Sequence, residues 1–446
     1  MKNTFKKLSA VLLVLVMVLA MSANAFAAEG QNPDMTGENG VIGEFTTPDV
    51  ATPQGTSVKI YKEITAYNPE ECEVYAPAIT FNYTIAAGDA GKDIYDANSH
   101  HNPASNVHAQ TKAGVGSPTI TDKIELVPGT NKLNASVNGT ANRFPLTINF
   151  AEVNFLTQGS GAGVYRYVIS ETTTEAAKNA ANIKEGSGAN TLYLDVYVNG
   201  NGEIYGYVLF TNNDDPIDAS ANDDVAAATA AGKTEGFVGS QPNNGKYGSE
   251  DASVADKYYT FNLAITKKVE NDDYIKNTHH EFPFTVTLDN PTVTANVLPI
   301  MTVGENATQT ALSAGAIGTG ENATVWTPTI ADSATITYVG IPTGTTVTIK
   351  ETNNVTGVTY SSVSTNADTN AAVKNIYTND TSNNAIVNCG ATALAKATDN
   401  HTVTFTNTLL QISPTGIVMR VAPYVLILAA GVALLVLSRR RREEEV

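Results

Sequence analysis

Three residue types recur in the same order in two stretches of this chain. Each stretch has a lysine on an early strand, a glutamate on a middle strand and an asparagine on its last strand. The two sets are Lys62, Glu171 and Asn262, and Lys267, Glu351 and Asn407. Alternating apolar neighbours put both lysines and Asn407 on strand faces that point toward a core. A buried ammonium or carboxylate is costly unless it is neutralised or paired.

One reaction would remove that cost. In an apolar pocket the pKa of a lysine falls and that of a glutamate rises, so both groups can be neutral. A neutral amine is a nucleophile, and a protonated glutamate can donate a hydrogen bond to an asparagine side-chain oxygen. Attack on the asparagine carbonyl with loss of ammonia would give a Lys–Asn isopeptide bond. This chemistry needs no cofactor and turns over once, so the chain is not expected to be an enzyme.

The sequence offers no other reactive centre. It contains no nucleophile–base pair, phosphate-binding loop or metal-ligand spacing. Its histidines lie in polar or terminal segments, and we interpret them as solvated loop residues without a metal. They are His100, His101, His108, His279, His280 and His401. Cys72 and Cys389 fall in different predicted domains, so we expect no disulfide between them.

The elements that position the recurring residues are predicted to be strands. Short alternating apolar runs bounded by Gly, Asn and Asp are typical of β-sandwiches. Strands at 58–62, 79–85, 165–171 and 258–262 have counterparts at 263–267, 282–288, 346–351 and 403–407. The fold class is therefore all-β, with two tandem Ig-like β-sandwich domains at 51–262 and 263–410 and almost no linker. Residues 199–202 (Asn-Gly-Asn-Gly) predict a hairpin.

The N-terminal end predicts export. Residues 1–27 combine a basic start, an apolar run and small residues of the A-x-A type, which is the pattern of a secretory signal peptide. Cleavage anywhere between Ala25 and Ala28 fits this pattern. Residues 28–50, rich in Gly, Pro, Thr and Asn, are expected to be a flexible leader.

The C-terminal end, residues 411–446, predicts attachment to the cell wall. A motif at 412–416 (Ile-Ser-Pro-Thr-Gly) precedes an apolar span at 421–437 and a basic tail at 438–446. The span, with 17 residues, is at the short limit for crossing a bilayer, and the arginines after it would stay on the cytoplasmic side and hold the precursor in the membrane. The motif is similar to the Leu-Pro-x-Thr-Gly sorting signals. That similarity implies sortase cleavage between Thr415 and Gly416, directly after Pro414.

Charge limits the choice of partners. The chain has 27 Lys and Arg against 44 Asp and Glu, a formal net charge of −17. Removing the two signals takes away eight basic and three acidic residues, so 19 basic and 41 acidic residues remain, a net of −22. Such an acidic surface argues against nucleic acid and anionic lipid as partners. The membrane is expected to matter only to the precursor.

The whole chain resembles the two-domain major pilins of sortase-assembled Gram-positive pili, the streptococcal pilin isopeptide-linkage family. The resemblance rests on the lysine strands, the Tyr-rich strand ending in Glu171, the last Phe-Thr-Asn strand and the segment 414–424. It implies a Lys62–Asn262 bond assisted by Glu171 and a Lys267–Asn407 bond assisted by Glu351.

The first of these bonds has an alternative acceptor. Thr260 stands where the family usually has Phe, and residues 208–212, ending in Asn212, fit the local motif better. Strand order favours Asn262, because the lysine strand must pair beside the last strand. Both acceptors stay open at this point.

The resemblance also implies a function: a structural subunit of a covalently polymerised pilus on the cell surface. Its partners would be a pilus-type sortase and neighbouring identical subunits, and beyond them minor pilins and peptidoglycan. Thr415 would be joined to a lysine of the next subunit, for which Lys257 is the first candidate and Lys246 the second. A monomeric wall-anchored adhesin or pilus-base subunit is the alternative, since it shares every motif except the acceptor lysine.

Overall fold

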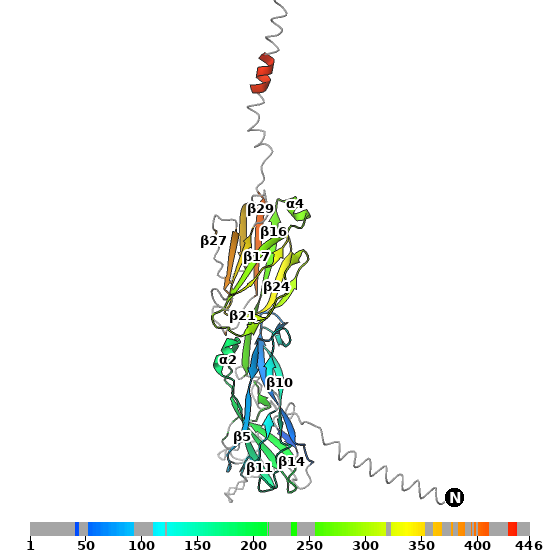
Figure 1. The fold of residues 1–446 in the computed structure, drawn as a ribbon, viewed down its shortest axis with the longest axis vertical. Coiled ribbons are helices and arrows are strands. Elements are labelled where there is room, and N and C mark those ends of the chain that lie inside the picture. The colour runs from blue at the N-terminus through cyan, green and yellow to red at the C-terminus, as the bar shows by residue number, and fades with distance from the viewer. Residues whose placement is uncertain are drawn as a thin grey trace, which may run out of the picture.

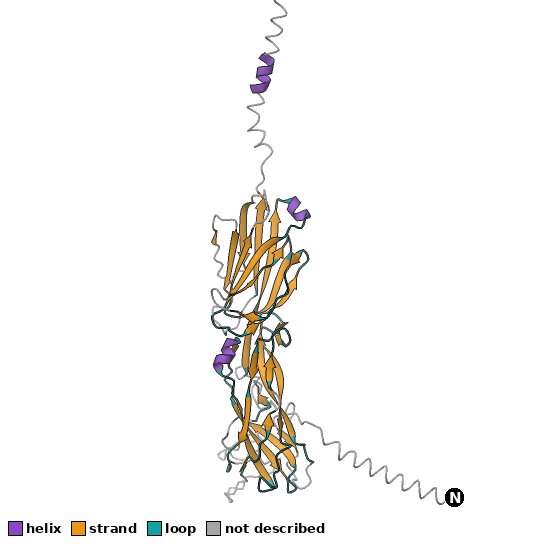
Figure 2. Cartoon of the chain, viewed as in Figure 1, coloured by secondary structure: helices purple, strands orange, loops and turns teal. Residues whose placement is uncertain are grey.

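The structure is a computed structural model of the full chain. It describes residues 41–43, 52–92, 110–120, 123–211, 213, 233–238, 255–317, 323–352, 360–367, 376–377, 382–388, 394, 397, 400–409 and 427–434. Two β-sandwich units are stacked end to end along the long axis of the molecule (Figure 1). The described helices are short, and strands make up most of both units (Figure 2). The prediction of an all-β protein with two tandem sandwiches is confirmed.

Two sheets face each other in the first unit. One has the order β1(Val41–Gly43), β14(Ile204–Phe210), β13(Thr191–Val198), β11(Gly163–Glu171) and β5(Tyr83–Ala87), with β6(Lys112–Ala113) also on β11. The other contains β2(Ser57–Tyr67), β10(Thr140–Asn149), β7(Thr119–Ile120), β12(Ile183–Lys184), β15(Gly236–Phe237) and the start of β16(Asp256–Glu270). Two small pairs, β3(Cys72–Tyr75) with β9(Lys132–Ala135) and β4(Ile79–Phe81) with β8(Ile124–Leu126), complete the unit.

The second unit repeats this plan. Its first sheet has the order β19(Ile300–Val303), β24(Thr335–Pro342), β16, β29(His401–Leu409) and β26(Tyr360–Ala367). Its second sheet has the order β20(Ala307–Thr308), β23(Thr329–Ile330), β17(Phe282–Asp289), β25(Thr346–Thr352), β28(Ser382–Asn388) and β27(Ile376–Tyr377), with β22(Thr324–Trp326) on β17. A small pair joins β18(Asn296–Val297) to β21(Gly315–Ala316).

Strand β16 belongs to both units. Its beginning pairs in parallel with β2, and its end pairs in parallel with β29. Tyr258 lies in the core of the first unit, and Phe261 lies in the core of the second. The chain therefore passes from one core to the other inside a single strand, close to the predicted boundary after residue 262.

Alternation along the strands decides which side chains enter the two cores. In β29 the buried side chains are His401, Val403, Phe405 and Asn407, every second residue. The same period holds for β25, where Val347, Ile349 and Glu351 are buried. Because successive side chains of a strand point to opposite faces, a polar residue in phase with an apolar run is carried into the core.

Two predictions about the first unit can be compared directly with the structure. The expected hairpin at 199–202 joins β13 to β14, and the Gly202 amide donates to the Asn199 carbonyl at 3.0 Å. The prediction of a flexible leader at residues 28–50 was wrong for 41–43. These residues form β1 and pair antiparallel with β14. The remainder of the leader lies outside the described residues, as does the signal peptide, 1–27.

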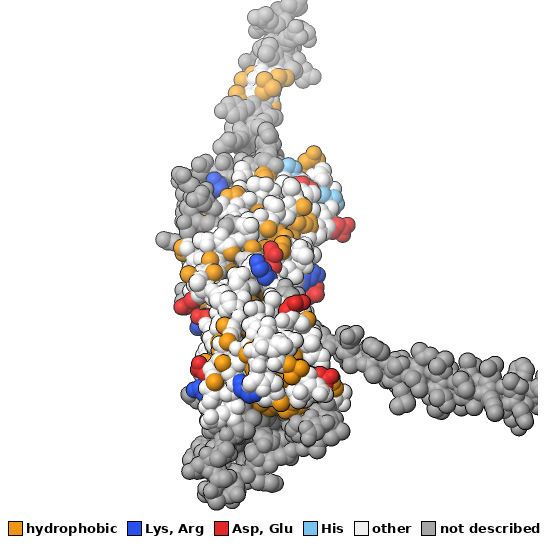
Figure 3. Space-filling model, turned by 60° about the horizontal axis from the view of Figure 1, so that its bottom comes forward, with side chains coloured by type: hydrophobic (Ala, Val, Ile, Leu, Met, Phe, Trp, Pro, Cys, Tyr) orange, Lys and Arg blue, Asp and Glu red, His pale blue; other side chains and the backbone are white. Residues whose placement is uncertain are grey.

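The C-terminal signal lies mainly outside the described residues too. Of the predicted span 421–437, the structure describes 427–434, which form a helix. Within the described part of the chain, no helix is both long enough and apolar enough to cross a membrane. On the face drawn in Figure 3, the described charged side chains are scattered singly or in small groups over a largely uncharged surface.

Candidate cross-linking sites

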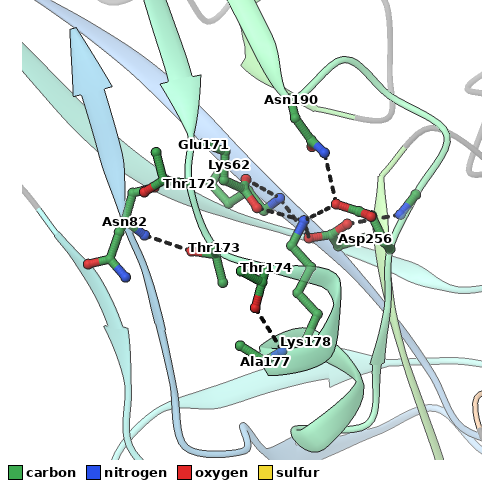
Figure 4. A network of polar contacts seen from close by, with 12 residues as sticks. Lys62, Asn82, Glu171, Thr172, Thr173, Thr174, Ala177, Lys178, Asn190 and Asp256 are labelled. Atoms are coloured by element: carbon green, nitrogen blue, oxygen red, sulfur yellow. Dashed lines mark hydrogen bonds and ion pairs between the residues drawn. The ribbon is translucent and has the colours of Figure 1, made fainter.

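The first site surrounds Lys62 at the centre of the first unit. Its Nζ lies 2.8 Å from Glu171 Oε2 and 2.8 Å from Asp256 Oδ2 (Figure 4). Lys62 is on β2, Asp256 is the first residue of the neighbouring strand β16, and Glu171 ends β11 in the opposite sheet. All three side chains are buried. The ring of Phe81 lies beside the amine, 4.9 Å from its centroid to Nζ.

A second lysine enters the same site. Lys178 is on the short helix α2(Glu175–Ala180), which begins at the N-cap Thr174, and it is fully buried. Its Nζ lies 2.6 Å from Glu171 Oε1, 3.1 Å from Asp256 Oδ2 and 2.9 Å from Glu185 Oε1. Glu171 and Asp256 are therefore each shared by two amines, whereas Glu185 contacts one of them, Lys178, accepts a hydrogen bond from Asn190 and is partly exposed to solvent.

The charges in the first site stabilise one another. Burial alone would lower the pKa of Lys178, but the charges of Asp256 and Glu171 outweigh burial and raise that pKa above its ordinary value. Burial would likewise raise the pKa of Asp256, but Lys62 and Lys178 hold it below its ordinary value. In this arrangement Lys178 is an ammonium and Asp256 is a carboxylate at neutral pH.

The prediction that Lys62 meets Asn262 was wrong. Asn262 is on β16 as expected, but six residues beyond Asp256, and six extended residues span about 20 Å. Its side chain exchanges hydrogen bonds of 2.8 and 3.0 Å with Asn68 and accepts one of 3.2 Å from the Gly340 amide, at the junction of the two units. The alternative acceptor, Asn212, lies outside the described residues.

The second site brings together all three predicted residues. Glu351 Oε1 lies 3.2 Å from Lys267 Nζ and accepts a hydrogen bond of 2.9 Å from Asn407 Nδ2. Lys267 and Asn407 are on the parallel neighbours β16 and β29, and Glu351 reaches across from β25 in the opposite sheet. The three side chains are buried, and the Phe282 ring centroid lies 4.6 Å from the amine.

The second site has fewer charged groups than the first, with one lysine and one acid in contact. Burial lowers the pKa of Lys267 to about 8, although the Glu351 carboxylate opposes the shift. Among the described residues, Glu351 Oε2 and Asn407 Oδ1 are buried without a hydrogen-bond partner. An amine that is easily deprotonated therefore lies beside a buried acid and a buried amide, which is the combination that the isopeptide reaction requires.

The two sites occupy equivalent positions in their units. Asp256 pairs with Ile64, two residues after Lys62, and Asn407 pairs with Val269, two residues after Lys267. The glutamates also correspond. Glu171 pairs with Tyr83, two residues after the Phe81 ring, and Glu351 pairs with Phe284, two residues after the Phe282 ring. Asp256 is thus the counterpart of Asn407.

Sequence reasoning missed Asp256 and Lys178. Asp256 left a signal, because it has the same phase along the strand as the chosen Asn262, with Tyr258 and Thr260 between them. Lys178 left none, since nothing in the short run Glu-Ala-Ala-Lys-Asn-Ala indicates which side chain the helix buries.

The other predicted site residues lie elsewhere. Lys257 is half-buried on β16, between Thr65 of β2 and Lys184 of β12. The second candidate, Lys246, and the sorting residues Pro414, Thr415 and Gly416 lie outside the described residues.

One histidine assignment was wrong. His401 is buried on β29, where its ring meets that of Phe261 edge to face at 5.5 Å. It is buried because it is in phase with the apolar residues of the strand. His279 is exposed, and His280 is half-buried against Phe282. His100, His101, His108 and the predicted unpaired Cys389 lie outside the described residues, and Cys72 is a free thiol. Within the described ranges, no three or more His, Cys, Asp or Glu side chains are grouped so that they could bind a metal ion.

Comparisons with known proteins come from structures and from one family model. The chain is similar to the major pilin protein (T-13) from Streptococcus pyogenes, with 16% identity and a TM-score of 0.31 over 83% of this chain and 99% of that one. A second major pilin from Streptococcus pyogenes matches with 15% identity and a TM-score of 0.34, over 79% of this chain and 98% of that one.

A bacterial adhesin from Mobiluncus mulieris that contains disulfide, isopeptide and ester cross-links matches with 13% identity and a TM-score of 0.23, over 80% of this chain and 100% of that one. Likenesses this distant do not assign a role to this chain. No curated protein matches it. Residues 261–409, which make up the second unit, match the family model described as a domain of unknown function (DUF7601).

Proposed function

We propose that this chain is a structural subunit of a covalently polymerised surface pilus, and that an internal amide bond joins the first and last strands of each unit. The observation that carries this proposal is the shared register of the two sites. In both units a buried lysine, an acceptor two positions further along the neighbouring parallel strand, and a glutamate from the opposite sheet converge beside a phenylalanine ring.

In the second unit the bond would join Lys267 to Asn407. The amine attacks the side-chain carbonyl carbon of Asn407, Glu351 carries protons between the two groups, and ammonia leaves. The lowered pKa of Lys267 supports this role, because it reduces the free energy needed to form the neutral nucleophile.

In the first unit the bond would join Lys62 to Asp256, with Glu171 in the place of Glu351. The acceptor is then a carboxyl group instead of an amide, so water leaves instead of ammonia. Each bond would close a long loop and constrain the unfolded chain, which is worth about 5 kcal/mol per bond by loop-entropy arguments.

These bonds would also form a path for tension. A pull on Thr415 enters the C-terminal end of β29, passes through Asn407 to Lys267, and continues along β16 to Asp256 and then to Lys62. Strand β16 carries the acceptor of one bond and the nucleophile of the other, so one continuous strand would connect the two cross-links. Neither sandwich would need to unfold under load, which suits a fibre subunit.

Polymerisation would join Thr415 of one subunit to a lysine of the next. Lys257 directly follows Asp256, and Lys246 lies ten positions before it, so either lysine would bring the load to the start of β16. Lys257 lies between two paired strands and is half-buried, whereas Lys246 lies outside the described residues.

Export of the chain together with a pilus-type sortase tests this function. We expect a ladder of covalent multimers that survives boiling in detergent, and loss of the ladder in Lys246→Ala or Lys257→Ala. Lys123→Ala, at an exposed position, is the matched control. A single wall-linked species in place of the ladder would contradict the shaft role and favour a wall-anchored adhesin or pilus-base subunit.

A further inference from the structure

The two sites differ by two residues whose charges cancel. The first site has an aspartate where the second has an asparagine, which adds one negative charge. It also has Lys178, which adds one positive charge and has contacts of 2.6 Å to Glu171 and 3.1 Å to Asp256. The buried part of each site is therefore neutral overall: two lysines face two acids in the first, and one lysine faces one acid in the second.

We propose that Lys178 is the positioning residue that allows an aspartate to serve as the acceptor in the first unit. This inference rests on the proposed amide bond between Lys62 and Asp256. Both acids contact both amines, and in this proposal Lys178 stays an ammonium that balances the charge of Glu171, so that one proton can pass from Lys62 to Asp256 without leaving an unbalanced charge. Glu185 also contacts Lys178, but it is partly exposed to solvent, which screens its charge.

The proton balance shows why the extra cation matters. One proton moves from the Lys62 ammonium, along Glu171, to a carboxyl oxygen of Asp256. The neutral amine then attacks the carboxyl carbon, a nitrogen–carbon bond forms, and the carbon–oxygen bond breaks. The departing hydroxyl takes a second proton from the nitrogen and leaves as water. None of these reaction steps leaves Glu171 as a buried carboxylate without a counter-charge, because the Lys178 ammonium stays beside it.

Lys178 also lies where negative charge develops. Its Nζ is 3.1 Å from Asp256 Oδ2, an oxygen that becomes more negative when the amine attacks. A pocket lined in part by Lys62, Asn190 and Asp256 borders the site and would give the released water a way out. After the reaction, the Lys178–Glu171 ion pair would remain intact and fully paired next to the new amide.

Without Lys178, an aspartate acceptor would leave one buried acid unpaired whenever Lys62 is neutral. With an asparagine acceptor and Lys178 still present, the site would hold a surplus buried cation. Either imbalance is costly in a core. The two residues should therefore be coupled: changing one alone should harm the reaction, and changing both should restore it with a different leaving group.

The experiment measures the mass of the cross-linked Lys62 peptide in the whole exported chain. We expect the bond, with a loss of about 18 Da, to form nearly completely in the wild type and to become a minor species in Lys178→Met and in Asp256→Asn. The double variant, Lys178→Met with Asp256→Asn, should recover the bond with a loss of about 17 Da, because ammonia now leaves. The second-unit bond in the same molecules reports that the second unit is folded in each variant, and the recovered bond of the double variant reports that the first unit folds without Lys178 and Asp256.

Two results would overturn this role for Lys178: full bonding in Lys178→Met, or a double variant that bonds no better than the single variants. A residue that only supports the fold would show no such recovery, since the double variant carries both defects. The proposed bond itself fails separately, if the wild type shows no mass loss at Lys62.

Discussion

Lys62 and Asp256 meet at 2.8 Å between two parallel strands, and the equivalent strands of the second unit bring Asn407 to the same position relative to Lys267. Because Asp256 opens β16 and Lys267 lies near the end of that strand, both sites are built on one element. The register of β16 against β2 and β29 therefore determines which side chains can react in each unit.

The acceptor in the first unit can be identified by comparing two substitutions. We expect Asp256→Ala to abolish the loss of about 18 Da at Lys62, because no carboxyl carbon remains to be attacked. Asn262→Ala should keep that mass loss, since Asn262 lies about 20 Å along the strand from the acceptor. It should still lower stability by about 1–3 kcal/mol, because it removes both hydrogen bonds to the buried Asn68 side chain and the acceptor of the buried Gly340 amide. Loss of the bond in Asn262→Ala and its retention in Asp256→Ala would reverse the assignment.

Glu351 should be required for the second bond. In Glu351→Gln the side chain keeps its shape but cannot carry a proton between Lys267 and Asn407, so we expect the loss of about 17 Da to disappear from the Lys267 peptide. Without the cross-link, the thermal midpoint of the second unit should fall by about 10 °C or more. Glu305→Gln, at an exposed position, is the matched control and should leave both quantities unchanged. Normal bonding in Glu351→Gln would exclude a proton-carrying role for this residue.

The burial of Lys267 makes the stability of an uncross-linked second unit depend on pH. In Asn407→Ala the bond cannot form, so Lys267 remains titratable, with a folded-state pKa of about 8 against an ordinary value of 10.5. Between these values the unfolded chain binds more protons than the folded chain, so the free energy of unfolding rises with pH. Below about pH 8 the folded chain must bury Lys267 as an ammonium, so the full unfavourable free energy of burying the charge applies there.

We expect Asn407→Ala to gain on the order of 2–3 kcal/mol in unfolding free energy between about pH 7.5 and pH 10, relative to the double variant with Lys267→Met. Denaturant titrations of both proteins at several pH values measure this difference. If the difference does not change with pH, or if Asn407→Ala loses stability as pH rises, then Lys267 is not held in the predicted state.

Alternation of apolar residues made most of the fold predictable. It located the strands that carry Lys62, Glu171, Lys267, Glu351 and Asn407. It also predicted that both lysines and Asn407 face a core, and all three are buried. The order of the strands was also inferred correctly for the first unit, since β16 does lie beside β2. These features follow from local periodicity and from the repeat, both of which are visible in a single sequence.

The register between two paired strands was less predictable than which strands pair. Pairing β2 with β16 does not say which residue of β16 lies opposite Lys62, because a strand can slide by two residues and keep the same face inward. The prediction of Asn262, where the structure has Asp256, was therefore an error of register, and the register is fixed by contacts far away in the sequence. Lys178 was missed for a related reason, since only the packing of α2 against the sandwich shows that its amine enters the site.

The measurement that bears most directly on this account is the intact mass of the exported chain, followed by tryptic mapping of its cross-linked peptides. We predict a mass about 35 Da below the value that the sequence gives between the two observed chain ends, from the loss of one water and one ammonia. The map should contain one peptide pair joined through Lys62 and Asp256 and another joined through Lys267 and Asn407. An unshifted mass, with Lys62 and Lys267 recovered in linear peptides, would contradict it.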